Sequence, residues 1–357
     1  MRGVLTAASI LALFLTLWTV FPAPNAALYP LAVVTPEISP VLLALQFVIL
    51  ISAIWPTRGR RSRVAIWCSL VGLCLNGYIL RQAWPYREMR QPKPIYSSAV
   101  FVKGVKFAEP GGVALRMNVA RPPDRQVHPV IVTIHGGSWQ NGSPDDDFVF
   151  LDHWAKVGYA VFAIDYRRAP THRFPAQLED VRAALNFIVQ HAPEYNADVR
   201  RMVLFGRSAG GHLAMLAAYT PGAPRVSAVM SYYGPTDPTA GYNGPPSPDP
   251  MDIRRILRDL LGGTPQEHPD DYAQASPITY AGSKRPPTLL VHGGRDHVVK
   301  AVFAERMFER LRSGGTDAEL LTLPWAEHAF DAVFWGLSNY IALARMDEFL
   351  ARLAAPE

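Results

Sequence analysis

Three side chains that could together activate a nucleophile each follow a short apolar run of the sequence. Ser208 lies in Gly-Arg-Ser-Ala-Gly, Asp296 comes shortly after Leu-Leu-Val-His, and His328 comes shortly after Leu-Thr-Leu-Pro. A serine hydroxyl is a weak nucleophile until a base takes its proton, and a carboxylate can orient an imidazole to be that base. We therefore predict an acyl-transfer site in which His328 takes the proton of Ser208 and later returns it to the leaving group. Asp296 would hold the imidazole in the right tautomer.

Small residues surround Ser208. Gly206 and Gly210 lie two positions before and after it, between the apolar run 202–205 and a helical pattern at 209–218. A sharp strand-to-helix turn brings the two flanks close together, which requires small residues. The G-x-S-x-G pattern alone is common, but its place between a strand and a helix indicates a nucleophile.

A second loop could stabilise the negative charge that develops on an attacked carbonyl. The sequence His-Gly-Gly-Ser-Trp at 135–139 ends an apolar run and can turn backbone N–H groups toward an oxyanion. The predicted donors are the N–H groups of Gly137 and Ser138, together with that of Ala209, the residue after the nucleophile. His135 is an alternative base, but bracing this loop by hydrogen bonding is the favoured interpretation.

Other residues near these motifs have weaker assignments. Trp139 and Arg207 are expected to line the substrate pocket. Asp237 also follows an apolar run and is the alternative acid. His212 and His297 lie near the site in sequence but are poorly placed to take the proton of the nucleophile.

No metal or organic cofactor is predicted. The two cysteines, Cys68 and Cys74, lie in one apolar stretch and offer neither a disulfide framework nor a thiolate metal site. The net charge is +5, but no basic helix or zinc-finger spacing accompanies it, so nucleic-acid binding is not expected.

The residues from about 96 onward alternate between strand-like and helix-like patterns, which predicts an α/β fold with a mostly parallel sheet covered on both faces. In such sheets, sites form at the carboxyl ends of the strands, where the three candidate residues lie. A hairpin with a Pro-Gly-Gly turn at 104–122 precedes the alternation. Strands are expected at 129–134, 160–164, 202–205, 228–232, 288–291 and 319–323, and helices at 148–157, 175–191, 209–218, 302–312 and 333–353.

Three apolar stretches precede this domain, at about 3–20, 38–55 and 64–80, and we expect each to span a membrane. A buried hairpin and a cleaved signal peptide are the alternatives. Arginines 58, 60, 61 and 63 lie between the second and third stretches, so the positive-inside rule predicts a cytoplasmic loop there and an extracytoplasmic catalytic domain. The predicted organisation is a membrane region at 1–84, a linker at 85–95 and a catalytic domain at 96–357, with 234–275 as a lid insertion.

The stretches HGGSW, DYRRAPTHRFPAQLEDVRAAL, GRSAGGHLA, SPITY, LLVHGGRDHVV and EHAF run between about residues 130 and 331. Together they resemble the α/β-hydrolase esterases and lipases related to hormone-sensitive lipase, including acetyl-esterase and kynurenine-formamidase-like enzymes. The resemblance implies a cofactor-free serine hydrolase and assigns the triad to Ser208, Asp296 and His328.

Two departures favour the HGGxW branch of these enzymes. Ser138 replaces the last glycine of the HGGG motif, and Arg207 replaces the acidic residue of GDSAG. Three membrane spans are typical of neither branch.

The leading hypothesis is a membrane-anchored serine esterase acting on a small-molecule or lipid-like ester, with the lipid bilayer as its other partner. An arylformamidase-type amidase with the same triad and a non-catalytic interaction module are the alternatives. No oligomeric state is predicted.

Overall fold

The computed structural model describes residues 2–54 and 62–354. Its larger part, from about residue 96 onward, is the α/β domain, built on a sheet of eight strands within these residues, in the order β1-β2-β4-β3-β5-β6-β7-β8. The strands are β1 Val100–Ala108, β2 Leu115–Arg121, β3 His128–Ile134, β4 Ala160–Ile164, β5 Ala197–Arg207, β6 Ala228–Tyr232, β7 Thr288–Gly293 and β8 Ala318–Leu323.

The sheet is parallel from β4 to β8 in this order, and the hairpin strands β1 and β2 join it antiparallel. The predicted Pro-Gly-Gly turn connects β1 to β2, where Gly111 and Gly112 have φ values of 59° and 82°. The sequence prediction of a mostly parallel sheet entered by a hairpin is therefore confirmed.

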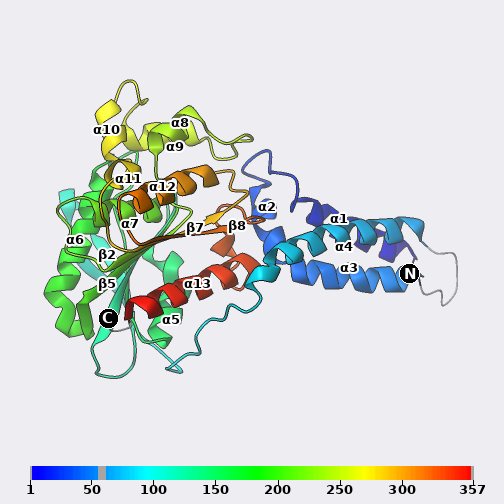
Figure 1. The fold of residues 1–357 in the computed structure, drawn as a ribbon, viewed down its shortest axis with the longest axis horizontal. Helices are drawn as coiled ribbons and strands as arrows, with labels where there is room; N and C mark the ends of the chain where they lie inside the picture. Colours follow the sequence, from blue (N-terminus) through cyan, green and yellow to red (C-terminus); the bar gives the residue numbers. More distant parts are fainter. Residues whose placement is uncertain (1, 55–61, 355–357) are drawn as a thin grey trace.

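Helices cover both faces of the sheet, as Figure 1 shows. Successive residues of β3 alternate between two cores, because strand side chains point to opposite faces in turn. Val130 and Val132 face α6 (Ala176–His191), α7 (Ala209–Tyr219) and α12 (Ala301–Ser313). Ile131 belongs to the core formed with α5 (Phe148–Lys156) and α13 (Leu337–Ala354). Burial on both faces explains why β3 and β4 are continuous apolar runs rather than alternating ones.

The segment 234–275 lies on the side of the domain that carries Ser208, since Asp237, Ile253 and Leu257 line the same cavity as that serine. It contains the short helices α8 (Pro238–Asn243), α9 (Ile253–Leu261) and α10 (Pro269–Gln274), and α11 (Pro277–Tyr280) follows it. Helix α9 buries Ile256, Leu257, Leu260 and Leu261 on one side, while its arginines lie on the other. Helix α9 is therefore amphipathic, and its apolar side packs into the core shared with α6 and α7.

Helices α1 (Arg2–Leu17), α3 (Ser39–Ile54) and α4 (Arg63–Ala83) pack side by side into a bundle, here called the stem, which projects from the α/β domain (Figure 1). Inside the stem, Gln46 donates a hydrogen bond of 2.9 Å to the Thr16 hydroxyl and accepts one of 3.1 Å from Asn76. A Cβ atom on Gly72 would overlap the Gln46 side chain, so glycine lets the amide fit between the helices.

The stem has fewer helices of span length than the sequence led us to expect. Among the described residues, the helical stretch Arg63–Tyr86 alone is long and apolar enough to cross a membrane by itself. Helix α3 reaches that length only together with α2 (Tyr29–Glu37), from which it is bent by 78°, and Gly3–Leu17 is shorter. At 1.5 Å per residue, the 16 residues of α1 extend about 24 Å, less than a typical hydrocarbon core of about 30 Å.

Helix α2 was not predicted. It begins at Tyr29 with Pro30 in its first turn, and it packs against α13 and the 3-10 turn η5 (Phe330–Ala332) of the α/β domain. The 3-10 turn η1 (Trp84–Tyr86) lies at the start of the linker. At its other end, the backbone N–H groups of Ile95 and Tyr96 donate hydrogen bonds to the carbonyl oxygen of Lys156, the last residue of α5. The arginine-rich loop lies, except for Arg63, outside the described residues.

Candidate active site

Ser208 occupies the turn between β5 and α7 and has left-handed φ, with φ 53° and ψ −119°. The two glycines beside it have no room for a side chain. A Cβ on Gly206 would lie 2.2 Å from the Gly210 backbone, and a Cβ on Gly210 would lie 1.9 Å from the carbonyl oxygen of Ile134. The close approach of β3, β5 and α7 therefore explains the glycines of G-x-S-x-G and holds the serine in a strained conformation.

The structure brings the three predicted triad residues together. His328 Nε2 lies 2.9 Å from Ser208 Oγ, and His328 Nδ1 lies 2.7 Å from Asp296 Oδ2. The carboxylate can only accept, so Nδ1–H donates to Asp296 and leaves Nε2 to accept from the serine hydroxyl. This is the tautomer in which the imidazole can take the proton of Ser208.

Asp296 is held as an ionised acceptor. Its other oxygen, Oδ1, accepts hydrogen bonds from the N–H groups of Val298 and Val299, at 2.8 and 2.7 Å. Burial by itself would raise the pKa of Asp296, but the neighbouring His328 and hydrogen bonds from His292 and His328 hold that pKa well below its usual range. The carboxylate therefore stays charged and can stabilise an imidazolium.

The 135–139 loop lies against the nucleophile. A Cβ on Gly136 would lie 3.4 Å from Ser208 Cβ, and one on Gly137 would lie 2.2 Å from the carbonyl oxygen of Asn141. Gly137 has φ 112°, and Ser138 and Trp139 also have positive φ. Ala209 opens helix α7, so its N–H has no acceptor within the helix. The three expected oxyanion donors thus come from segments that meet at Ser208.

His135 makes its hydrogen bonds with groups other than the nucleophile. Its Nδ1 lies 2.7 Å from the carbonyl oxygen of Gly136 and its Nε2 3.3 Å from Asp165, and its ring stacks on Tyr166. It therefore braces the loop, as expected.

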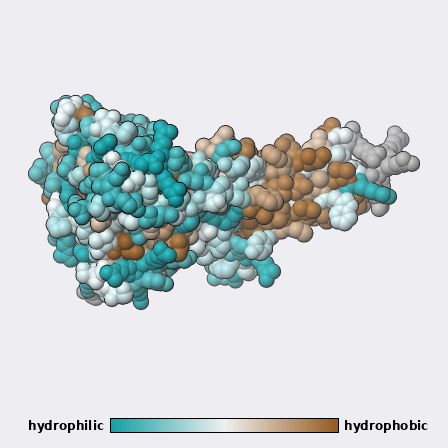
Figure 2. Space-filling view, turned by 90° about the horizontal axis from the view of Figure 1, so that it is seen from above, coloured by the Kyte–Doolittle hydropathy of each residue, from teal (hydrophilic) through white to brown (hydrophobic). Residues whose placement is uncertain are grey.

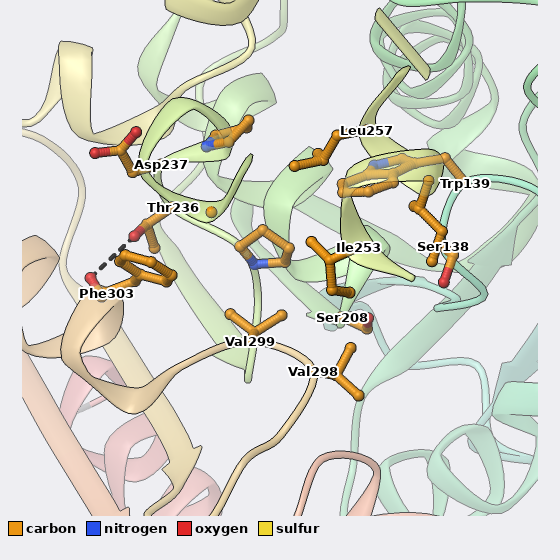
Figure 3. Close-up of a pocket in the computed structure, with 14 residues that line it drawn as sticks. Ser138, Trp139, Ser208, Thr236, Asp237, Ile253, Leu257, Val298, Val299 and Phe303 are labelled. Carbon is orange, nitrogen blue, oxygen red and sulfur yellow. Dashed lines mark hydrogen bonds between the residues drawn. The ribbon is translucent and has the colours of Figure 1, made fainter. Parts of the chain in front are cut away.

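An apolar cavity opens beside Ser208. Figure 3 shows Ser138, Trp139 and Ser208 on one side of it, with Val298 and Val299 below. Helices α8 and α9 contribute to its wall, so the segment expected to form a lid does line the cavity. The remaining lining residues are Pro235, Thr236, Asp237, Pro238, Gly241, Ile253, Ile256, Leu257 and Phe303.

Trp139 lines this cavity, and His212 fixes its ring. The Trp139 indole donates a 3.2 Å hydrogen bond to His212 Nδ1, while His212 Nε2 donates a 2.6 Å bond to the carbonyl oxygen of Ala275. Burial lowers the pKa of His212 to about 4, so the ring is neutral at neutral pH. His212 therefore supports the pocket and does not act as a base.

Arg207 does not line the cavity, which corrects the expectation from sequence. Its guanidinium donates to Asp147 (3.0 Å from Nε) and to Asp331 (2.8 Å), and it lies over the Phe150 ring on the α5 face of the sheet. Strand alternation explains this placement, because Phe205, two residues earlier, faces the same core. The sequence did not single out Asp147 and Asp331, the buried partners of Arg207.

The remaining candidates have other partners. Asp237 caps helix α8, where its Oδ1 accepts from the N–H of Ala240 at 2.9 Å. His297 lies 2.6 Å from Glu327, another residue that the sequence did not single out. Within residues 2–54 and 62–354, no group of three or more potential ligands is arranged to hold a metal ion.

Known proteins resemble this chain over the α/β domain and beyond. LipM of Mycobacterium tuberculosis, a probable carboxylic ester hydrolase, is 28% identical over 322 residues, covering 86% of this chain and 72% of LipM. That share exceeds the α/β domain, so the match includes part of the N-terminal helices. The esterase LipC of the same organism is 32% identical over 218 residues, covering 57% of this chain and 53% of LipC.

Solved structures share the fold. An esterase of Thermogutta terrifontis, Est2, superposes with a TM-score of 0.59 at 24% identity, covering 73% of this chain and 97% of that one. The bifunctional GH43-CE protein of Bacteroides eggerthii superposes with a TM-score of 0.60 at 28% identity, covering 71% of this chain and 38% of that one.

A family model described as BD-FAE matches residues 117–311, which is more than half of the chain. The match begins within β2, ends within α12 and includes Ser208 and Asp296. The resemblance to α/β-hydrolase esterases seen in the sequence motifs is confirmed by these relatives and by the fold. This chain is an α/β-hydrolase and belongs to the BD-FAE family.

Proposed function

We propose that this protein is a membrane-anchored serine hydrolase that cleaves carboxylic esters through an acyl-enzyme on Ser208. The chain is a carboxylic ester hydrolase by kinship, since LipM is named a probable carboxylic ester hydrolase and LipC an esterase. The observation that carries the mechanism is the hydrogen-bonded series Ser208 Oγ, His328 and Asp296, with distances of 2.9 and 2.7 Å.

The reaction runs in two halves. Ser208 Oγ attacks the ester carbonyl while its proton passes to His328 Nε2, and Asp296 stabilises the imidazolium. The N–H groups of Gly137, Ser138 and Ala209 stabilise the oxyanion. The alcohol leaves with the proton from His328. A water molecule then attacks the acyl-enzyme, giving its proton to His328, and Ser208 recovers a proton when the acid leaves.

The cavity favours an ester with an apolar portion. Most of its lining is apolar, including Ile253, Ile256, Leu257, Val298 and Phe303, which offer contact area to an alkyl chain, whereas Asp237 is its one acidic lining residue. Each methylene that such a pocket buries contributes about 1–3 kcal/mol, so esters whose acyl chain fills the cavity are favoured. We therefore expect short and medium acyl esters to be accepted.

Membrane anchoring is supported by the surface of the stem. Figure 2 shows apolar residues gathered along it, whereas the α/β domain is mostly hydrophilic. Only 28% of the apolar window in Arg63–Tyr86 is buried, although a helix in the core of a soluble protein would be mostly buried. Trp67 and Trp84, near the two ends of α4, are 67% and 64% exposed, which suits aromatic side chains at the two lipid–water interfaces.

In this arrangement the stem crosses the membrane with the α/β domain at one end. The arginines between α3 and α4 favour a cytoplasmic position for the other end, which makes the catalytic domain extracytoplasmic. Carbonate extraction tests the anchoring, because an embedded stem keeps the chain in the membrane pellet and a peripheral chain is released. Protease digestion of intact spheroplasts tests the orientation, because an extracytoplasmic domain is cut and a cytoplasmic one is protected.

The catalytic proposal is tested with the full chain in detergent, assayed on p-nitrophenyl acetate, butyrate and laurate. Ser208→Ala should lose several orders of magnitude in rate and all labelling by a fluorophosphonate. Equal rates and labelling in both proteins would refute the serine mechanism. Rates on phenyl acetate and on N-formylaniline separate an esterase from an amidase. If the wild-type protein hydrolyses neither compound and is not labelled by the fluorophosphonate, the interaction module is favoured.

A further inference from the structure

The N-terminal helices touch the loops that carry the acid and the base. The carbonyl oxygen of Thr19, just after α1, accepts a hydrogen bond from Arg295, the residue before Asp296. Tyr29, which begins α2, places its hydroxyl 3.4 Å from the carbonyl oxygen of His328. Figure 1 shows α2 between the stem and the α/β domain, near the ends of β7 and β8. Part of the contact between the two parts of the chain is therefore made at the loops of the candidate active site.

A second histidine–carboxylate pair lies beside the triad pair. His297 follows Asp296, and Glu327 precedes His328. His297 Nδ1 lies 2.6 Å from Glu327 Oε1, and the N–H of His297 donates to Glu327 Oε2 at 3.2 Å. The Glu327 side chain is fully buried, and its hydrogen bond raises the pKa of His297. Glu327 therefore connects the loop that carries Asp296 with the loop that carries His328, directly beside the hydrogen bond between those two residues.

Tyr29 covers this pair and supports the pocket wall. Its hydroxyl lies 3.5 Å from Glu327 Oε2, at the long end of hydrogen bonding. Its ring packs against the cluster of Val298, Val299 and Phe303, all of which line the substrate cavity. Val298 and Val299 also donate the backbone hydrogen bonds that hold Asp296. One aromatic ring from the N-terminal region therefore backs the pocket, the acid loop and the base loop.

We propose that Glu327 and Tyr29 are positioning residues for the triad, so that the N-terminal region is part of the active site as well as an anchor. The inference rests on the proposed serine hydrolase. Its physical basis is that catalytic groups act only within a fraction of an ångström of their productive geometry, and a displacement of about 1 Å costs about a hundredfold in rate. Glu327 sets the spacing of the two loops, and the Tyr29 ring prevents them from moving away from Ser208.

The test uses full-length variants in detergent and p-nitrophenyl acetate, a substrate too small to depend on the distant pocket wall. Glu327→Gln keeps the shape of the side chain and removes its charge, and we expect kcat to fall about ten- to a hundredfold with KM within about twofold of wild type. Tyr29→Ala should lower kcat by at least about tenfold, and Tyr29→Phe, which keeps the ring, should restore most of that loss. The matched control is Tyr78→Ala on the stem, where the side chain is 61% exposed and no loss is expected.

The outcomes separate this inference from the proposed function. Complete fluorophosphonate labelling of Ser208, but at a reduced rate, is expected in both Glu327→Gln and Tyr29→Ala. A kcat within twofold of wild type in both variants overturns the inference and leaves the serine hydrolase intact. A loss confined to KM also overturns it, because the residues would then only shape the pocket. If wild type neither labels nor hydrolyses, the proposed function itself has failed. Should Tyr29→Ala not fold, Glu327→Gln alone decides.

Discussion

Replacing Arg207 by methionine should destabilise the protein far more than an ordinary surface substitution. The guanidinium binds Asp147 and Asp331, whose side chains are each 1% exposed, and it also donates to the carbonyl oxygen of Asp146 at 3.1 Å. Burial by itself would lower the pKa of Arg207, but the two buried carboxylates outweigh that effect and hold the pKa well above its usual value. Methionine replaces the side chain only as far as Nε and leaves both carboxylates without a cation.

The magnitude follows from the cost of a buried, uncompensated charge. Removing one partner of a buried pair costs about 3–5 kcal/mol of unfolding free energy. For a domain of this size, each kcal/mol lowers Tm by roughly 2–4 °C, so a fall of roughly 6–20 °C is expected. Changing Asp147 and Asp331 to asparagine in the same protein should recover most of the loss, because the unpaired charges are then gone.

Thermal unfolding followed by circular dichroism in detergent measures this effect. Arg200→Met is the matched control, because Arg200 also pairs with an aspartate of β5, Asp198, but its side chain is 89% exposed. That substitution should cost less than about 1 kcal/mol. If Arg207→Met melts within about 2 °C of wild type but raises KM for esters, the buried-network interpretation is refuted and the substrate contact expected from the sequence is restored.

Three further outcomes are expected. Because burial lowers the pKa of His212 from 6.5 to about 4, the unfolded chain binds a proton more readily, so wild type should lose roughly 3 kcal/mol of stability as pH falls from 6.5 to 4. Urea unfolding at several pH values checks this, and His212→Gln should lack that part of the slope. Gly210→Ala should prevent folding, because its Cβ would lie 1.9 Å from the Ile134 carbonyl oxygen. Gly77→Ala is the control, because a Cβ there meets no atom within 4 Å. The two variants are compared by soluble yield and by fluorophosphonate labelling. Leu257→Trp should fill the cavity and lower kcat/KM for p-nitrophenyl laurate relative to acetate by roughly tenfold, and an unchanged ratio would place the acyl chain elsewhere.

The strand ends were readable from the sequence because each combines a buried apolar run with turn residues. The runs 160–164 and 228–232 match β4 and β6 residue for residue. Glycines with no room for a side chain then mark the turn at Ser208. Local signals of this kind locate the candidate nucleophile, acid and base, since parallel strands end at the same edge of a sheet.

Contacts between distant segments were not readable. Helix α2 has prolines at positions 30 and 36 and no helical periodicity, so its helical form depends on packing against η5 and α13. The direction of Arg207 could have been inferred from strand alternation, but its aspartate partners come from segments about 60 and 124 residues away. Burial of Glu327 likewise depends on loops that meet only in the folded chain.

The polar interior of the stem has a mechanical consequence. Gln46 bonds to both Thr16 and Asn76, and Gly72 admits its amide, so sliding any helix along another would leave these groups without partners in an apolar interior. The helices are therefore locked at one height relative to each other, and α2, which joins α1 to α3 in the chain, is locked with them. In the membrane-anchored arrangement proposed above, this fixed height would set how far from the lipid surface the pocket of Ser208 opens, and so the depth of the membrane surface from which it could take esters.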